Sequence, residues 1–146
     1  MQKLKEQIEK VADATQTDQF LRSCAKELAA RLLGKVIRRT PVRKPENCPP
    51  GVVGGTLKRG WTGGKNSSGA NYANSLNVNK VGTDYVIEII NPVEYASYVE
   101  FGHRTRDHKG WIEGHFMLTV AEDEIRKSAP RILEKKLEKY LKECFT

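Results

Sequence analysis

The chain has 146 residues and a formal net charge of +7, with 38% hydrophobic and 29% charged residues of both signs. This balance predicts one folded domain over residues 1–146 and excludes a wholly disordered chain. No apolar run approaches the roughly 20 residues of a membrane-spanning helix, and residues 1–10 lack the apolar stretch of a secretory signal, so we expect a protein that stays inside the cell.

Two helices are expected at the start of the chain. Residues 1–14 have helical character, and a stronger pattern runs from about Asp18, a plausible N-cap, to Arg39. Pro41 ends this second helix, because it pushes Thr40 out of the helical region and supplies no amide hydrogen. Apolar residues recur in the helix at spacings of three and four, which predicts one buried stripe: Leu21, Cys24, Ala25, Leu28, Leu32 and Val36.

Residues 41–71 are rich in glycine and proline and predict an extended arm. Connections longer than about 12 to 15 residues are uncommon in compact domains and tend to be functional or disordered. Within the arm, the alternation in TLKRGWT (56–62) favours an edge strand that carries Leu57 and Trp61 on one face. The arm has too few apolar residues to fold alone, so we expect it to become ordered against another surface, such as a second copy of the chain.

An antiparallel hairpin is expected next. YANSLNVNK (72–80) places Tyr72, Leu76 and Val78 on one face, and TDYVIEII (83–90) is apolar and β-branched enough for a central strand. VGTD (81–84) supplies the turn between them.

A short apolar helix and a long charged helix complete the expected elements. Asn91 and Pro92 are typical of a helix start, and Gly102 of a stop; the apolar residues between them surround the helix, which predicts cover on several sides. After a polar loop over 102–114, residues 115–146 predict a helix kinked near Pro130. The predicted fold class is α+β: a small antiparallel sheet packed by long N- and C-terminal helices, with an extended Gly/Pro-rich basic arm.

Catalytic and metal sites are poorly supported. His103, Asp107, His108, Glu113 and His115 are suitable zinc ligands, but their spacing in a loop between glycines defines no tetrahedron, so a solvated loop is the better interpretation. The glycine-rich strings GVVGGTLKRG and GGKNSSG lack P-loop spacing, and no GxSxG elbow is present. The three cysteines are odd in number and form no CxxC pair. We therefore expect no enzyme, no metal and no cofactor.

Positive charge is concentrated in residues 31–65, which hold nine Lys and Arg residues against Glu46, a net charge of +8. Such a segment predicts an acidic partner, either nucleic acid or an acidic protein surface. The basic residues nearest the aromatic Trp61 make a non-specific nucleic-acid-binding module one alternative function, although no sequence-reading motif accompanies them. This predicted basic patch comprises Arg38, Arg39, Arg43, Lys44, Lys58, Arg59 and Lys65.

A family resemblance rests on five strings in a fixed order: RTPV (39–42), GTLKRGW (55–61), YVIEIIN (85–91), EYASYVEFGHR (94–104) and GWIEGHFML (110–118). In these the chain, from about Thr40 to its C-terminus, resembles the tail-component family of tailed bacteriophages, the neck or tail-completion proteins that join head to tail. One departure is the inserted RKPENCPPGVVG (43–54), where members of the family have a shorter link.

The resemblance implies a non-enzymatic virion protein, made in the host bacterial cytoplasm and placed in the neck or tail. It implies a ring, expected to be hexameric, that contacts the connector, the tail terminator and the tail tube, with possible contact to packaged DNA and none to a membrane. Exposed apolar surface and head-to-tail self-association agree with that role. The predicted subunit or partner interface comprises Tyr95, Tyr98, Val99, Phe101, Gly102, His103, Arg104, Leu57 and Trp61.

Overall fold

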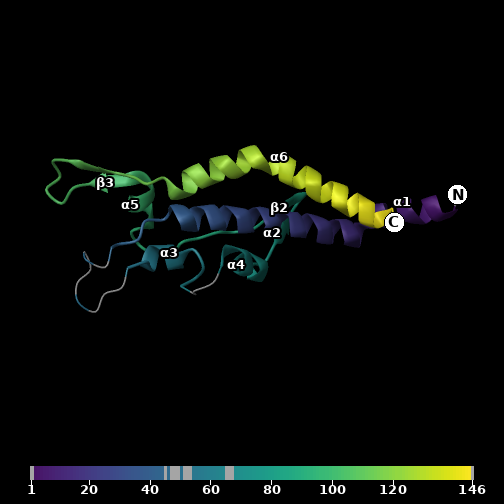
Figure 1. The fold of residues 1–146 in the computed structure, drawn as a ribbon, viewed down its shortest axis with the longest axis horizontal. Helices are drawn as coiled ribbons and strands as arrows, with labels where there is room; N and C mark the ends of the chain where they lie inside the picture. Colours follow the sequence, from purple (N-terminus) through teal and green to yellow (C-terminus); the bar gives the residue numbers. More distant parts are fainter. Residues whose placement is uncertain (1, 45, 47–49, 51–53, 65–67, 146) are drawn as a thin grey trace.

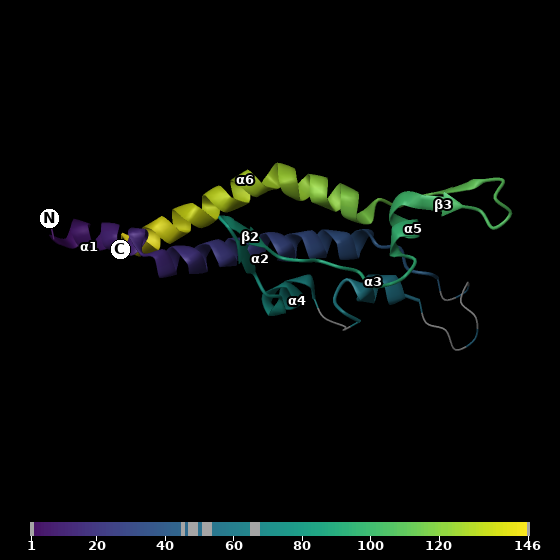
Figure 2. The same ribbon diagram turned by 180° about the vertical axis from the view of Figure 1, so that it is seen from behind.

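The computed structural model describes residues 2–44, 46, 50, 54–64 and 68–145. In this part of the chain the fold is α+β, as predicted, with long N- and C-terminal helices and two separate two-stranded antiparallel sheets. The molecule is elongated: α2 (Ala14–Arg39) runs along its axis, with α6 (Met117–Cys144) on one side and the short α3 (Thr56–Gly60) and α4 (Gly69–Ser75) on the other (Figures 1 and 2).

The first two helices are confirmed, with an earlier start for the second. After α1 (Gln2–Ala12), the Asp13 carboxylate accepts hydrogen bonds from the backbone amides of Thr15 (2.8 Å) and Gln16 (3.3 Å), which makes Asp13 the N-cap of α2. The predicted N-cap, Asp18, lies inside the helix and accepts from Arg22 Nε and Tyr85 Oη, both at 2.8 Å. The helix ends at Arg39, as predicted.

Helix α6 confirms the C-terminal helix predicted over residues 115–146, although the observed helix begins only at Met117. It lies antiparallel to α2: the Phe20 and Tyr140 rings stack at 4.5 Å near one end, and Thr40 Oγ1 lies 3.4 Å from Met117 Sδ near the other. Pro130 lies inside α6, and the ribbon bends near its middle (Figure 1). The missing amide hydrogen of proline gives the physical reason for such a bend.

Residues 57–62 of the predicted arm are packed on the body of the protein as a helical turn, so the expected edge strand is wrong, whereas residues 41–44 are exposed. Residues 56–60 form α3, which follows Gly55 in the left-handed region (φ 97°). Leu57 and Trp61, four residues apart, lie on the buried side of this turn, each 4% exposed. Trp61 Nε1 donates a 2.8 Å hydrogen bond to Thr40 Oγ1.

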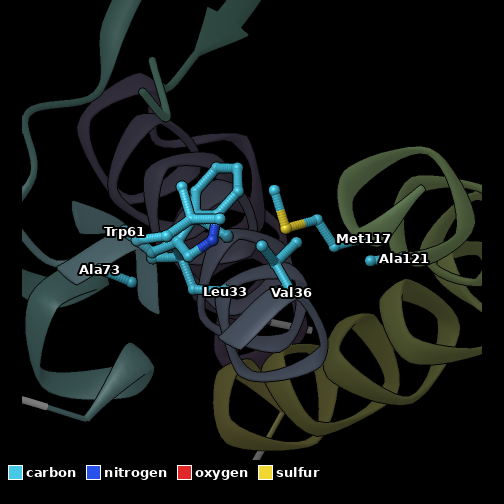
Figure 3. Packing of buried hydrophobic residues seen from close by; sticks show 8 residues of the cluster. Leu33, Val36, Trp61, Ala73, Met117 and Ala121 are labelled. Carbon is cyan, nitrogen blue, oxygen red and sulfur yellow. The ribbon is translucent and has the colours of Figure 1, made fainter. Parts of the chain in front are cut away.

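The core forms where α2 meets its neighbours on both sides. Figure 3 shows Leu33 and Val36 of α2 between Met117 and Ala121 of α6 and the side chains of Trp61 and Ala73. Ala73 belongs to α4, whose N-cap Ser68 accepts a hydrogen bond from the Asn71 amide at 3.1 Å. The predicted strand over residues 72–80 is therefore wrong in its first half.

The predicted hairpin exists in a shorter form. Strands β1 (Asn79–Val81) and β2 (Asp84–Val86) pair antiparallel, with Val81 opposite Asp84, and Gly82 takes φ 64° in the turn. Residues 87–90 continue outside a strand, although Ile87 and Ile89 still pack against the core. No central sheet forms in the described part of the chain.

The segment after the hairpin differs from the prediction at its start and beyond Gly102, whereas the predicted helix stop at Gly102 is confirmed, because Gly102 is the C-cap of this helix. Asn91 Oδ1 accepts from the Val93 amide at 3.2 Å, which makes a turn, and the helix α5 starts only at Ala96 and ends at Phe101. The expected polar loop is a second hairpin, in which β3 (Gly102–Arg104) pairs with β4 (Trp111–Glu113). Gly102 permits it by adopting φ 89°, a conformation that other residues rarely take.

Candidate functional site

A cluster of large apolar side chains is exposed at one end of the molecule. Tyr98 is 58% exposed, Phe101 61% and Trp111 56%, and these residues come from α5 and β4, at the end opposite both chain termini (Figure 1). Monomeric soluble proteins rarely expose large apolar patches without a function. We call this end of the molecule the aromatic end and define it by its exposed large apolar residues, of which the consecutive Trp111 and Ile112 lie on opposite faces of β4: Tyr95, Tyr98, Phe101, Trp111, Ile112 and Phe116.

The aromatic end arises because α5 has two apolar faces and only one is covered. Val93, Ala96 and Val99 are partly buried and pack against the core. Tyr98 and Phe101 point away from it and are exposed. The expected cover on several sides of this helix is thus present on one side only within a single chain.

The backbone of the aromatic end is tied to the start of α6. The His115 amide donates to the Val99 carbonyl at 2.7 Å, and the Phe116 amide donates to the Glu100 carbonyl at 3.0 Å. The rings of Phe101 and Phe116 then meet edge to face, with centroids 6.5 Å apart. These contacts hold side chains from both segments on one surface.

Glu100 is the buried residue that holds this arrangement in place, and no pattern in the sequence indicates its role. Its carboxylate, 5% exposed, accepts from the backbone amides of Leu118 (2.9 Å) and Thr119 (2.8 Å) and from Thr119 Oγ1 (2.6 Å). These two amides belong to the first turn of α6, where Phe116 provides no side-chain cap. Glu100 therefore caps α6 from another helix, and a carboxylate there also interacts favourably with the helix dipole.

His103 lies beside Tyr98, with ring centroids 5.6 Å apart. Its Nδ1 is shielded from solvent and has no hydrogen-bond partner among the described residues. Buried polar atoms are nearly always paired, so this nitrogen is an exception within the described residues.

Comparison with known proteins identifies the family. A family model described as "Bacteriophage HK97-gp10, putative tail-component" matches residues 2–102, more than two thirds of the chain. The chain belongs to the HK97-gp10-like family. The match includes both N-terminal helices and stops at Gly102, whereas the resemblance in sequence was expected from Thr40 onward. No curated protein and no solved structure matches the chain.

Family membership confirms the coarse prediction of a bacteriophage tail component, which makes the protein a structural part of the virion. Such a component works through contacts with other structural proteins of the phage. None of the helices in the described residues is both long and apolar enough to cross a membrane.

The metal-ligand candidates of this HK97-gp10-like chain are distributed along the second hairpin, except for His115, which follows it. Asp107 accepts from Thr105 Oγ1 (2.5 Å) and from the Lys109 amide (3.1 Å), and these bonds lower the pKa of its carboxyl below the ordinary 3.8, the Thr105 bond most. His108 sits in the same turn with φ 59°. Within the described ranges, no three His, Cys, Asp or Glu side chains gather as a metal site.

The predicted basic patch does not surround an exposed aromatic ring in the described residues. Trp61 is buried in the core and is not available to stack on a base, which removes the aromatic part of that argument. Arg39 pairs with Glu124, and Arg59 donates to the Gly54 carbonyl at 3.1 Å. Lys65 lies outside the described residues.

Proposed function

We propose that this tail component forms a ring, expected to be six-fold, in the neck of the particle and joins the head connector to the tail. Its direct partners are further copies of itself, the connector, the tail terminator and the tail tube. The role requires no catalysis. The observation that supports it most is the aromatic end, an apolar surface that a single copy leaves in contact with water.

A second apolar surface lies at the opposite end, which permits contacts between unlike patches. Leu4 and Ile8 of α1 are more than half exposed, and Phe145, which follows the end of α6, is also exposed. The C-terminal end of α6 lies beside α1 (Figures 1 and 2). A contact between two different patches on neighbouring copies generates a ring when the rotation closes. The elongated subunit with an apolar surface at each end is compatible with such a ring.

The predicted interface is narrowed by burial. Leu57 and Trp61 are enclosed in the core of the subunit, so we omit them from the proposed contact. Val99 packs against the core, and Gly102 shapes the hairpin. Tyr95, Tyr98, Phe101, His103 and Arg104 remain as proposed contact residues, and Trp111, Ile112 and Phe116 join them because they are exposed apolar residues of the aromatic end.

The test places a carboxylate in the proposed contact. Tyr98→Asp should leave a folded subunit, because Tyr98 is exposed, and should prevent assembly, because an unpaired carboxylate buried in an apolar contact costs several kcal/mol. Adding the variant protein to particles that lack this component and counting infectious particles measures particle completion. Electron microscopy shows whether tails are joined to heads. Val81→Asp, at an exposed hairpin position far from α5, is the matched control. Normal infectious particles with Tyr98→Asp would contradict the proposal.

A further inference from the structure

A groove lined by positive charge runs between α2 and α6, away from the aromatic end. Its volume is about 990 Å³, and it extends over residues 27–38 of α2 and 125–139 of α6, with Ala70 of α4 at its edge. Arg31, Lys35 and Arg38 line it from α2. Four more cations line it from α6: Arg131, Lys135, Lys136 and Lys139. The predicted basic patch included only Arg38 of these seven residues.

Most of these cations have no carboxylate partner. Glu27, the one acidic residue that lines the groove in the described part of the chain, pairs with Arg31 at 3.0 Å, and Lys35 pairs with Glu124 at 2.8 Å. The remaining five form no ion pair within the described residues. Several like charges around one concave surface attract an acidic group and raise its local concentration.

The floor of the groove is formed by apolar and small residues. Ile125 and Ile132 are half-buried there beside Ala30 and Gly34. A methyl group added at Gly34 would meet only the Arg38 guanidinium, at 3.8 Å, so the packing of the chain itself leaves this position open. An apolar floor between cationic walls suits an amphipathic ligand, since a phosphate backbone would use only the walls.

We propose that this groove binds an acidic amphipathic helix of another protein of the particle. A third helix can pack into the groove between two adjacent helices, at the interaxial distances of 8–10 Å usual for helix packing. The lined stretch of α6 is about 20 Å long at 1.5 Å per residue, the length of roughly four helical turns. Apolar side chains of the ligand cover Ile125 and Ile132, while its carboxylates meet the cations.

A second copy of this chain is a poor occupant. The chain carries a net charge of +7, and the acidic cluster on its own surface is engaged: Glu122 pairs with Arg126 and Asp123 with Lys127, both at 2.9 Å. Helix α1 is itself rich in lysine. The inference rests on the groove alone and does not depend on the proposed ring.

The test uses a defined probe and the full-length protein. The probe is a fluorescein-labelled synthetic helix of about three heptads, with leucine at positions a and d and glutamate at e and g, where repulsion between glutamates disfavours its self-association. Fluorescence anisotropy measures its binding. We expect saturable binding that a peptide of the same composition in scrambled order does not show.

Paired charge reversals on one helix locate the site. Arg131→Glu with Lys135→Glu should weaken binding by about tenfold or more, as expected for close charge pairs. Arg126→Glu with Lys127→Glu changes the net charge equally, but these side chains are 75% and 77% exposed outside the groove, so affinity should change by less than about twofold. Circular dichroism and urea unfolding verify that both variants are folded.

The floor is tested separately. Gly34→Leu should fill the groove and weaken binding about tenfold, whereas Gly34→Ala should not, because the open space at Gly34 accommodates a methyl group. Tyr98→Asp should bind the probe like the unmodified protein, which distinguishes this site from the proposed ring contact. Absence of binding, equal loss in both charge-reversed variants, equal binding of the scrambled peptide, or tighter binding of duplex DNA at the same site would each overturn the proposal.

Discussion

Removal of the Glu100 carboxylate should destabilise the protein more than any exposed substitution. Glu100→Ala leaves the amides of Leu118 and Thr119 without their acceptor at a position that is 5% exposed. A hydrogen bond to a charged group contributes about 1.5–3 kcal/mol, and the loss of an N-cap costs about 1 kcal/mol. Because the three bonds share one carboxylate, we expect their loss to be less than additive and to lower the free energy of unfolding by about 3 kcal/mol.

Urea unfolding followed by circular dichroism measures this change. For a chain of this length, a loss of about 3 kcal/mol corresponds to a fall in Tm of roughly 6–12 °C. Glu100→Gln should lie between Ala and the unmodified protein, because one amide oxygen still accepts while the NH₂ group faces another donor. Glu94→Ala, at an exposed carboxylate on the segment leading into the same helix, is the control and should change stability by less than about 0.5 kcal/mol. A loss below about 1 kcal/mol for Glu100→Ala would refute the remote cap.

Three further predictions concern acid stability, the core and the second hairpin. Hydrogen bonds from Arg22 and then Tyr85 lower the pKa of Asp18 below its ordinary 3.8, so the unfolded chain takes up the proton first as the pH falls. The stabilisation by ionised Asp18 is present above about pH 4 and is lost below it. In urea unfolding across that range, the free energy of unfolding of Asp18→Asn should therefore fall less steeply with acid than that of the unmodified protein. An unchanged pH dependence would contradict this role of Asp18. Trp61→Phe should lower the free energy of unfolding by about 2–3 kcal/mol, measured by thermal unfolding, because a buried hydrogen bond to Thr40 and ring volume are lost. Gly102→Ala should lower the stability of the second hairpin by about 1–3 kcal/mol, because φ is 89° and the added carbon would lie 2.5 Å from the Ile112 carbonyl oxygen. Limited proteolysis within residues 102–114 should be faster in this variant, and an unchanged rate would contradict the prediction.

The long elements and the family were predictable because their signals are local. The three-and-four spacing of apolar residues predicts α2 whatever it packs against, and Pro41 ends it through sterics that operate within two residues. The turn at Gly82 and the helix around Pro130 are likewise determined by neighbouring residues. The tyrosines and phenylalanine of the 94–104 string indicated both the family and an exposed apolar surface. The contact between subunits in an assembled ring stays a proposal.

Short segments were not predictable because a pattern of only a few apolar residues fits both the helical period of 3.6 and the strand period of 2. Leu57 and Trp61 are four residues apart, which puts them on one face of a strand and equally on one face of a helical turn. The same ambiguity affects Tyr72 and Leu76. The contact of Trp61 with Thr40 and the side of α2 decided in favour of a helix, and this packing also removed Trp61 from the predicted basic patch.

By itself, the amino-acid sequence determined that the long stretches α2 and α6 are helical, where positive charge is plentiful and which family the protein resembles, since each of these depends on neighbours along the chain. Only the tertiary structure decided that Glu100 caps a helix that begins at Met117, and that Arg31 and Arg131 line one groove. The reason is geometric: such pairs are brought together by the antiparallel packing of α2 and α6 and by the turn at Gly102, and no local pattern records a contact across that distance.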